Sequence, residues 1–231
     1  MSNKNNYFLS NGIKIINLYL GGIMKYIDFN DFERKEHYKF FESVDNPQFN
    51  ICMNIDVTNF LRFVKSNKIS FYYSMIYAST HVMNEIKDFR YKIRDGKIIL
   101  HDSLQPSFTD MESNKNLFKI VTLPLKKDII EFSNSAKEVS KNQKEYFPTI
   151  AEDQDKLIYF SCIPWISFTS ISNEIVMNKE DSIPRISFGK YFKQDNKVLL
   201  PYSVQVNHML LDGIHVGKYI EKLQNFIDKF Q

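Results

Sequence analysis

The residues best suited to chemistry lie in the segment Ser203–Lys218, where a strand-like run ends at Asn207-His208. Asp212 and Gly213 follow four and five residues after His208, and a helical pattern begins there. A histidine just past a strand end can accept a proton, because imidazole titrates near neutral pH and the strand fixes its position. An acid followed by glycine allows a tight backbone turn that holds such a loop in one geometry. A structural role for this short H-x-x-x-D-G pattern stays equally open. The other histidines have no partner at a useful spacing, and we expect them to be structural or exposed: His37, His81, His101 and His215.

The elements that must position this segment are predicted from hydrophobic periodicity. The pattern indicates strands at 49–57, 117–125, 157–165, 186–191 and 198–207, and helices at 29–43, 71–87, 127–144 and 213–230. Asp95-Gly96 lies between two alternating runs and predicts a hairpin. Strands and helices without regular alternation favour an α+β fold, an α/β sandwich with a mixed sheet covered by helices.

Composition and charge exclude several classes of protein. The 231 residues, 43% hydrophobic and 25% charged, suit a globular chain that builds its own core. The two cysteines, Cys52 and Cys162, exclude a disulfide scaffold and a four-cysteine zinc site, and they fit a reducing, cytoplasmic location. No apolar run approaches the roughly 20 residues of a membrane span. We therefore expect neither a metal site nor a membrane partner.

The first 23 residues differ from the rest of the chain. They carry Lys4 and Lys14 and no acid, so the remaining residues hold 28 basic and 27 acidic side chains, a net charge of 28 − 27 = +1. A near-neutral body argues against a nucleic-acid partner. Gly21-Gly22 before Met24 can be encoded by a bacterial ribosome-binding sequence. We therefore expect residues 1–23 to be an extension, a translated leader or a true arm, and residues 24–231 to be one domain.

Several blocks of the sequence together resemble the chloramphenicol acetyltransferases. They are FERKEHYKFF, SFYYSMIYASTHVMNE, SCIPWISFTS, GKYFKQDNKVLLPYSVQV and the His208 segment itself, and the resemblance spans Met24–Gln231. H-x-x-x-D-G alone is shared with the acyltransferase core of 2-oxo acid dehydrogenase complexes, whereas the other blocks are far more selective. The resemblance implies a CoA-dependent acyltransferase fold and a homotrimer whose active sites lie between subunits.

The resemblance also implies a reaction and roles for the residues. Acetyl-CoA, a co-substrate and not a permanently bound cofactor, gives its acetyl group to a hydroxyl of a small acceptor. In this family the acceptor is chloramphenicol, and its acetylation confers antibiotic resistance. His208 is implied to be the general base and Ser161 the donor to the oxyanion. Asp212 and Gly213 are implied to support the site, with Asp212 paired to Arg34.

The acceptor pocket implied by the resemblance differs in part from the family pattern. Its expected members are Phe40, Phe41, Phe118, Phe147 and Ser187. Phe41 stands where many relatives have tyrosine, and Ser187 where the family has a threonine that positions a water. Asn173 and Arg185 replace apolar pocket positions, and Asn207 replaces the first of two adjacent histidines. Two alternatives therefore remain: acetyl transfer to another hydroxyl compound, and a non-enzymatic trimer that binds a small molecule.

Overall fold

The computed structural model describes residues 24–112, 115–149, 153–174 and 176–230, so the expected extension at 1–23 lies outside the described residues. The strands are β1 (Met24–Tyr26), β2 (Gln48–Asp56), β3 (Tyr91–Arg94), β4 (Lys97–His101), β5 (Gln105–Met111), β6 (Phe118–Thr122), β7 (Leu157–Ile163), β8 (Arg185–Gly189), β9 (Phe192–Gln194) and β10 (Lys197–Asn207). The helices are α1 (Lys35–Glu42), α2 (Thr58–Ser66), α3 (Phe71–Asn84), α4 (Ile129–Asn142) and α5 (Gly213–Ile227). Short 3₁₀ turns lie at Phe29–Asp31, Lys87–Arg90 and Gln154–Lys156.

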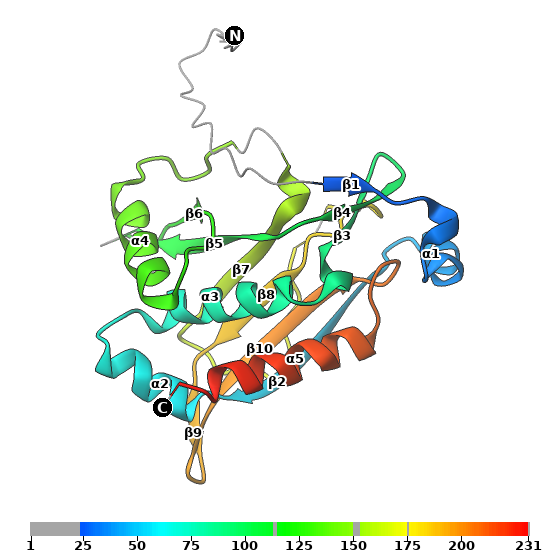
Figure 1. The fold of residues 1–231 in the computed structure, drawn as a ribbon. Helices are drawn as coiled ribbons and strands as arrows, with labels where there is room; N and C mark the ends of the chain where they lie inside the picture. The colour runs from blue at the N-terminus through cyan, green and yellow to red at the C-terminus, as the bar shows by residue number, and fades with distance from the viewer. Residues whose placement is uncertain (1–23, 113–114, 150–152, 175, 231) are drawn as a thin grey trace, which may run out of the picture.

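Two sheets organise these elements. The main sheet has the order β2-β10-β8-β7-β5-β6, with β9 added beside β10, and the smaller sheet has the order β1-β4-β3. Strand β7 pairs in parallel with β5 and β8, whereas the β10 pairs with β2, β8 and β9 are antiparallel. The predicted α+β fold with a mixed sheet and covering helices is therefore confirmed (Figure 1).

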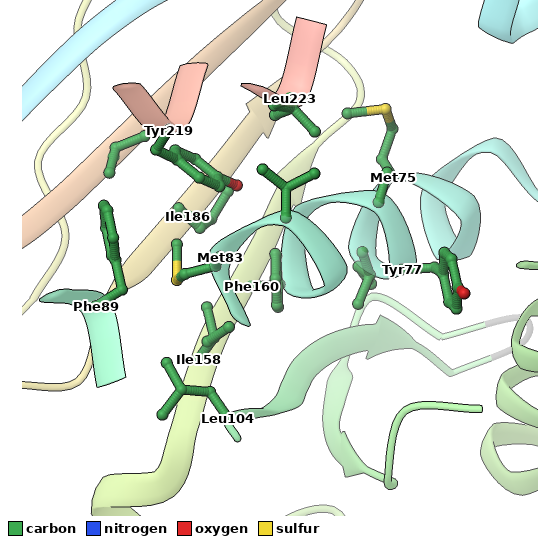
Figure 2. Packing of buried hydrophobic residues seen from close by; sticks show 14 of the residues in the cluster. Met75, Tyr77, Met83, Phe89, Leu104, Ile158, Phe160, Ile186, Tyr219 and Leu223 are labelled. Atoms are coloured by element: carbon green, nitrogen blue, oxygen red, sulfur yellow. The ribbon is translucent and has the colours of Figure 1, made fainter. Parts of the chain in front are cut away.

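One face of the main sheet carries the core. Helices α3 and α5 lie side by side across this face (Figure 1). Phe160 and Ile186 are directly paired on β7 and β8, and both lie in one buried cluster with Met83 of α3 and Tyr219 of α5 (Figure 2). Helix α3 buries most of its circumference, which explains why its sequence is mostly apolar.

The opposite face of the main sheet is polar. The pairing register places Ser161 of β7, Ser187 of β8, Ser203 of β10 and Cys52 of β2 in one row across the sheet. Directly paired residues project from the same face, and this row alternates with the apolar row that contains Phe160 and Ile186. Ile171 and Asn173, which lie between β7 and β8 in the chain, accept hydrogen bonds from this face.

The sequence pattern misjudged one helix. The prediction of a continuous helix over 29–43 is wrong, because a 3₁₀ turn at Phe29–Asp31 is followed by extended backbone at Phe32 and α1 begins only at Lys35. The Asp28 side chain accepts a hydrogen bond from the Asn30 N–H, a local bond that favours a turn over a helix. The break leaves Arg34 at the N-terminal boundary of α1.

Helix α2 and the central strand β5 were not predicted. Strand β5 contains Pro106, which argues against a central strand because proline donates no ladder hydrogen bond. The structure accommodates Pro106 because the pairing with β6 starts only at Ser107, so that Pro106 faces β7 alone. Pro201 in β10 is placed similarly, since its pairing with β8 starts at Tyr202.

The predicted hairpin at Asp95-Gly96 is confirmed between β3 and β4. Both turn residues have positive φ, 51° and 69°, and glycine adopts such angles without steric cost. Arg94 binds Asp153 and Asp155, and the buried His101 lies 2.8 Å from Asp155. His101 thus has a partner that sequence spacing did not reveal, and its role here is structural.

No helix of the described ranges is long and apolar enough to cross a membrane.

Lys92 of β3 is fully buried, and its amine donates to the backbone oxygens of Phe89 and Tyr91. Burial lowers the pKa of this amine to about 7, against the opposing pull of Asp155 and Asp181. Between pH 7 and about 10.4, the unfolded chain binds a proton that the folded chain does not, so stability falls as the pH drops through this range.

Replacing Lys92 with methionine removes this penalty. We expect Lys92→Met to stabilise the fold at pH 7 by a few kcal/mol, about 1.4 per pKa unit less the lost hydrogen bonds. The gain should shrink at pH 9.5, where more of the wild-type unfolded chain is neutral. Thermal melts of both proteins at both pH values measure this, with the exposed Lys137→Met as control. An equal difference in Tm at both pH values would contradict the argument.

Candidate active site

The candidate site begins where β10 ends. His208 directly follows Asn207, and its Nδ1 lies 3.0 Å from the backbone oxygen of Leu211. A carbonyl oxygen can only accept a hydrogen bond, so this contact is satisfied when Nδ1 carries the proton. The other nitrogen, Nε2, then keeps a lone pair, which is the form of imidazole that accepts a proton.

Two aromatic rings hold the imidazole. The Phe41 ring, from α1, stacks on His208 with a centroid distance of 3.9 Å and an interplanar angle of 12°. The Phe49 ring, from β2, lies 4.5 Å away and is tilted by 41°. Phe40 is 68% exposed and packs edge-on against Phe41, so it reaches the imidazole only through that ring.

Asn207 fixes the loop that carries His208. Its amide nitrogen donates to the backbone oxygens of Lys179 and Asp181, at 2.8 and 3.0 Å. Its amide oxygen accepts from the Met209 N–H at 2.9 Å. The buried Asn207 therefore joins the end of β10 to the segment before β8. Sequence reasoning noted this residue only as a replacement, because its partners are backbone atoms that are distant in sequence.

Arg34 and Asp212 lie on the far side of the same loop. Nη2 of Arg34 is 3.8 Å from the Asp212 carboxylate and 3.4 Å from the Leu211 oxygen that also contacts His208. Burial acts to raise the pKa of Asp212, but the Gly213 N–H and the charge of Arg34 outweigh it and hold the pKa below its ordinary value. The Asp212 side chain is 42% exposed, so the pair costs less to break than a fully buried one.

Gly213 does not act as the sequence suggested. The expected turn does not draw on the freedom of glycine, since Gly213 is the first residue of α5 and is absent from the residues with positive φ. A Cβ added there would meet no atom within 4 Å among the described residues. His215, one turn into α5, accepts the Asp212 N–H at its Nδ1, so it caps the helix.

A cavity of about 810 Å³ opens on the polar face of the main sheet. Four predicted site residues line it: Ser161, Ser187, Phe118 and Phe147. Phe118 and Phe147 meet edge to face at 5.8 Å, and they are 46% and 65% exposed. His208, Phe40 and Phe41 are not among the lining residues.

The polar side chains that line the cavity differ in how many hydrogen bonds they already form. The Ser187 hydroxyl donates to the side-chain oxygen of Asn173 at 3.0 Å, and Asn173 donates to Gln205 at 3.2 Å. Arg185 pairs with Asp181 at 2.6 Å. Within the described ranges, the Ser161 hydroxyl makes no hydrogen bond, which leaves its proton available to a ligand.

The strand register separates the two groups of site residues. Ser161 lies in one row with Ser203, two strands away, and His208 follows Ser203 by five residues. Five residues along a strand span about 16 Å and two strand spacings about 10 Å, which gives about 19 Å between the two backbones. The structure thus gathers Arg34, Phe41, His208 and Asp212 at one end of β10, and Ser161 and Ser187 at a different place.

Comparison with families of known proteins matches nearly the whole chain. The family model described as chloramphenicol acetyltransferase matches residues 23–224. A chloramphenicol acetyltransferase of Klebsiella sp is 31% identical over 208 residues, which cover 89% of this chain and 94% of that protein. One from Clostridium perfringens is 30% identical over 209 residues, covering 89% and 95%.

Solved structures show the same fold. A structure described as chloramphenicol acetyltransferase superposes with a TM-score of 0.82 at 25% identity, covering 89% of this chain and all of that one. A dihydrolipoamide acetyltransferase of Azotobacter vinelandii gives a TM-score of 0.62 at 13% identity, covering 83% and 85%. The second likeness is one of fold alone.

Proposed function

The chain belongs to the chloramphenicol acetyltransferase family, and on that premise we propose that it transfers the acetyl group of acetyl-CoA to a hydroxyl of a small acceptor. Chloramphenicol is the first acceptor to test, and its acetylation in the cytoplasm would confer resistance. The observation that carries the proposal is the His208 imidazole, held by the Leu211 oxygen with its Nε2 free to accept a proton.

In the proposed reaction, His208 Nε2 takes the proton of the acceptor hydroxyl as its oxygen attacks the thioester carbonyl. A C–O bond forms, the carbonyl electrons move onto oxygen, and the Ser161 hydroxyl donates to that oxyanion. The intermediate then collapses, the C–S bond breaks, and the CoA thiolate takes the proton from the imidazolium. No covalent enzyme intermediate is needed, because binding both substrates together supplies much of the acceleration.

Acetyl-CoA needs cationic neighbours for its phosphates. A hollow of about 290 Å³ beyond the end of β8 is lined by Arg62, Lys65 and Lys193, together with Tyr191 and Phe192. Three cations beside two aromatic rings suit an anionic, base-bearing co-substrate. We assign this hollow to the nucleotide end of acetyl-CoA.

The proposed site takes His208 from one chain and Ser161 from another. A general base must approach within about 3 Å of the proton that it abstracts, or reach it through one water. The separation of about 19 Å between the two residues in one chain is far too large for both to serve one acceptor. A ring of three copies with head-to-tail contacts resolves this, because each interface joins different surfaces of two subunits.

Two inactive variants should therefore rescue one another. His208→Ala chains supply an intact Ser161, and Ser161→Ala chains supply an intact His208. With random mixing, about one interface in four joins both intact residues, so co-expressed variants should recover roughly a quarter of wild-type activity. Thiol release measures this after mass spectrometry has verified mixed oligomers. Mixed oligomers without recovery would show that one chain provides both residues.

We expect Arg34 to affect the rate by positioning the loop that carries His208, and not by binding the substrate. We expect Arg34→Met to lower kcat about tenfold and to change KM less than twofold, because the Leu211 oxygen that orients His208 loses a donor. Arg34→Lys should restore only part of the rate, since the shorter side chain does not place its ammonium where Nη2 contacts both Leu211 and Asp212. A rate loss fully explained by the unfolded fraction in the same sample would contradict this positioning role.

The proposal as a whole is tested by thiol release from acetyl-CoA against a panel of hydroxyl compounds that includes chloramphenicol. Turnover with chloramphenicol supports the first acceptor. Turnover only with another compound favours the second candidate function, which rests on the polar Asn173 and Arg185 in the cavity wall. Binding of acceptors without any turnover would indicate that the chain is a non-enzymatic binding protein.

A further inference from the structure

The cavity that holds Ser161 has two unlike walls. Phe118 and Phe147 form an apolar wall, and both rings are exposed enough to meet a ligand. Asn173, Glu174 and Arg185 stand in the lining as well. An aryl pocket needs only a few polar groups to orient its ligand, whereas this one has Asn173, Glu174 and Arg185 in its lining. Arg185 also lines the neighbouring cavity, where its partners Asp181 and Ile183 lie.

These three polar groups keep free hydrogen-bonding capacity. Asn173 uses one N–H for Gln205 and one lone pair for Ser187, which leaves one N–H and one lone pair. Arg185 uses Nη1 for the Ile183 oxygen and Nη2 for Asp181, two of its five N–H groups. Glu174 is exposed and forms no ion pair or hydrogen bond within the described ranges. The wall therefore offers donors and acceptors together.

A hydroxyl group can use both the donors and the acceptors of this wall, since it donates one hydrogen bond and accepts others. Several hydroxyls on the edge of a ring match a wall with two donor residues and one carboxylate. The C–H faces of such a ring match the exposed faces of Phe118 and Phe147. A neutral aryl group against the same wall would instead leave the remaining N–H and lone pair of Asn173 desolvated and unpaired.

We propose that the acceptor is a polyhydroxylated ring, the chemistry of sugars and cyclitols, selected by Asn173 and Arg185. This inference rests on the proposed acetyl transfer and names its acceptor class. The charge of Arg185 is already balanced by Asp181 at 2.6 Å, so a neutral polyol fits the cavity better than an anionic acceptor. Discrimination is strong in such sites, because an acceptor without the hydroxyls leaves polar groups unpaired.

The test compares wild-type protein and variants in thiol release with four probes: methyl β-glucopyranoside, methyl β-galactopyranoside, myo-inositol and chloramphenicol. For wild type, we expect kcat/KM with at least one polyol to exceed that with chloramphenicol by about tenfold or more. Asn173→Leu, which is close to isosteric, should lower polyol kcat/KM about 10- to 100-fold, mainly through KM, and raise that for chloramphenicol. Asn142→Leu, at an exposed position of α4, is the matched control and should change neither.

Arg185 is tested with its partner changed as well, because Arg185→Met alone would strand the Asp181 carboxylate. The double variant Arg185→Met/Asp181→Asn should show the same reversal of preference. Wild-type protein that turns over chloramphenicol faster than every polyol, with the ratio unchanged in Asn173→Leu, overturns this inference and leaves the proposed function standing.

Direct binding separates the remaining outcomes. If neither these probes nor the wider panel of hydroxyl compounds supports turnover, the proposed function fails, and saturation-transfer NMR of the three polyols decides the inference. Binding to wild type that Asn173→Leu abolishes and Asn142→Leu retains supports the polyol pocket. Absence of polyol binding to wild type overturns it.

Discussion

Replacing His208 with alanine lowers thiol release by roughly 10² to 10⁴-fold, the usual contribution of a positioned general base. The loss should appear in kcat, because the proposed role places the imidazole against the reacting proton, whereas its ring contacts within the described ranges are Phe41, Phe49 and the Leu211 oxygen. Steady-state assays with the best acceptor measure the loss, and circular dichroism and native mass verify the fold and the assembly.

His37→Ala provides the matched control for His208→Ala. His37 lies on α1 and is exposed, and no hydrogen bond or ion pair of the described ranges involves it. Its removal should leave the rate unchanged. Near-normal turnover by folded His208→Ala protein would refute the general-base assignment.

Replacing Ser161 with alanine should lower kcat by about 10² and leave KM nearly constant. The Ser161 hydroxyl has no partner within the described ranges, so a developing oxyanion meets an uncommitted donor, and loss of one such donor is typically this costly. Ser135→Ala on α4 is the control, because that serine lies outside the cavity lining. An effect confined to KM would make Ser161 a binding residue.

Much of this architecture follows from local pattern. The Asp95-Gly96 hairpin and the long strand before His208 were predictable, since turn chemistry and continuous apolar runs are properties of neighbouring residues. Strand β5 was missed because its sequence contains Pro106, whereas α2 was missed although Phe60, Leu61 and Val64 are buried at helical spacing. In the folded chain, β6 and β7 provide the pairing of β5, and the core packs against the apolar side of α2.

The candidate site was predictable only in part. Resemblance pointed to His208, Arg34 and Asp212, and the structure brings these three together. The bonds of Asn207 and the coupling of Ser187 to Asn173 join residues or backbone atoms far apart in sequence, and no periodic pattern encodes them. The distance between His208 and Ser161 likewise depends on the register of three strands, which only the folded sheet defines.

The stacked rings around His208 have a consequence for entropy. An exposed imidazole samples several rotamers, and fixing a side chain costs up to about 2 kcal/mol at the moment when it must react. Phe41 covers one face of His208, Phe49 lies against the ring at an angle, and the Leu211 oxygen sets its rotation. Folding has therefore already fixed the rotamer of this side chain, so its entropy cost does not recur in each turnover.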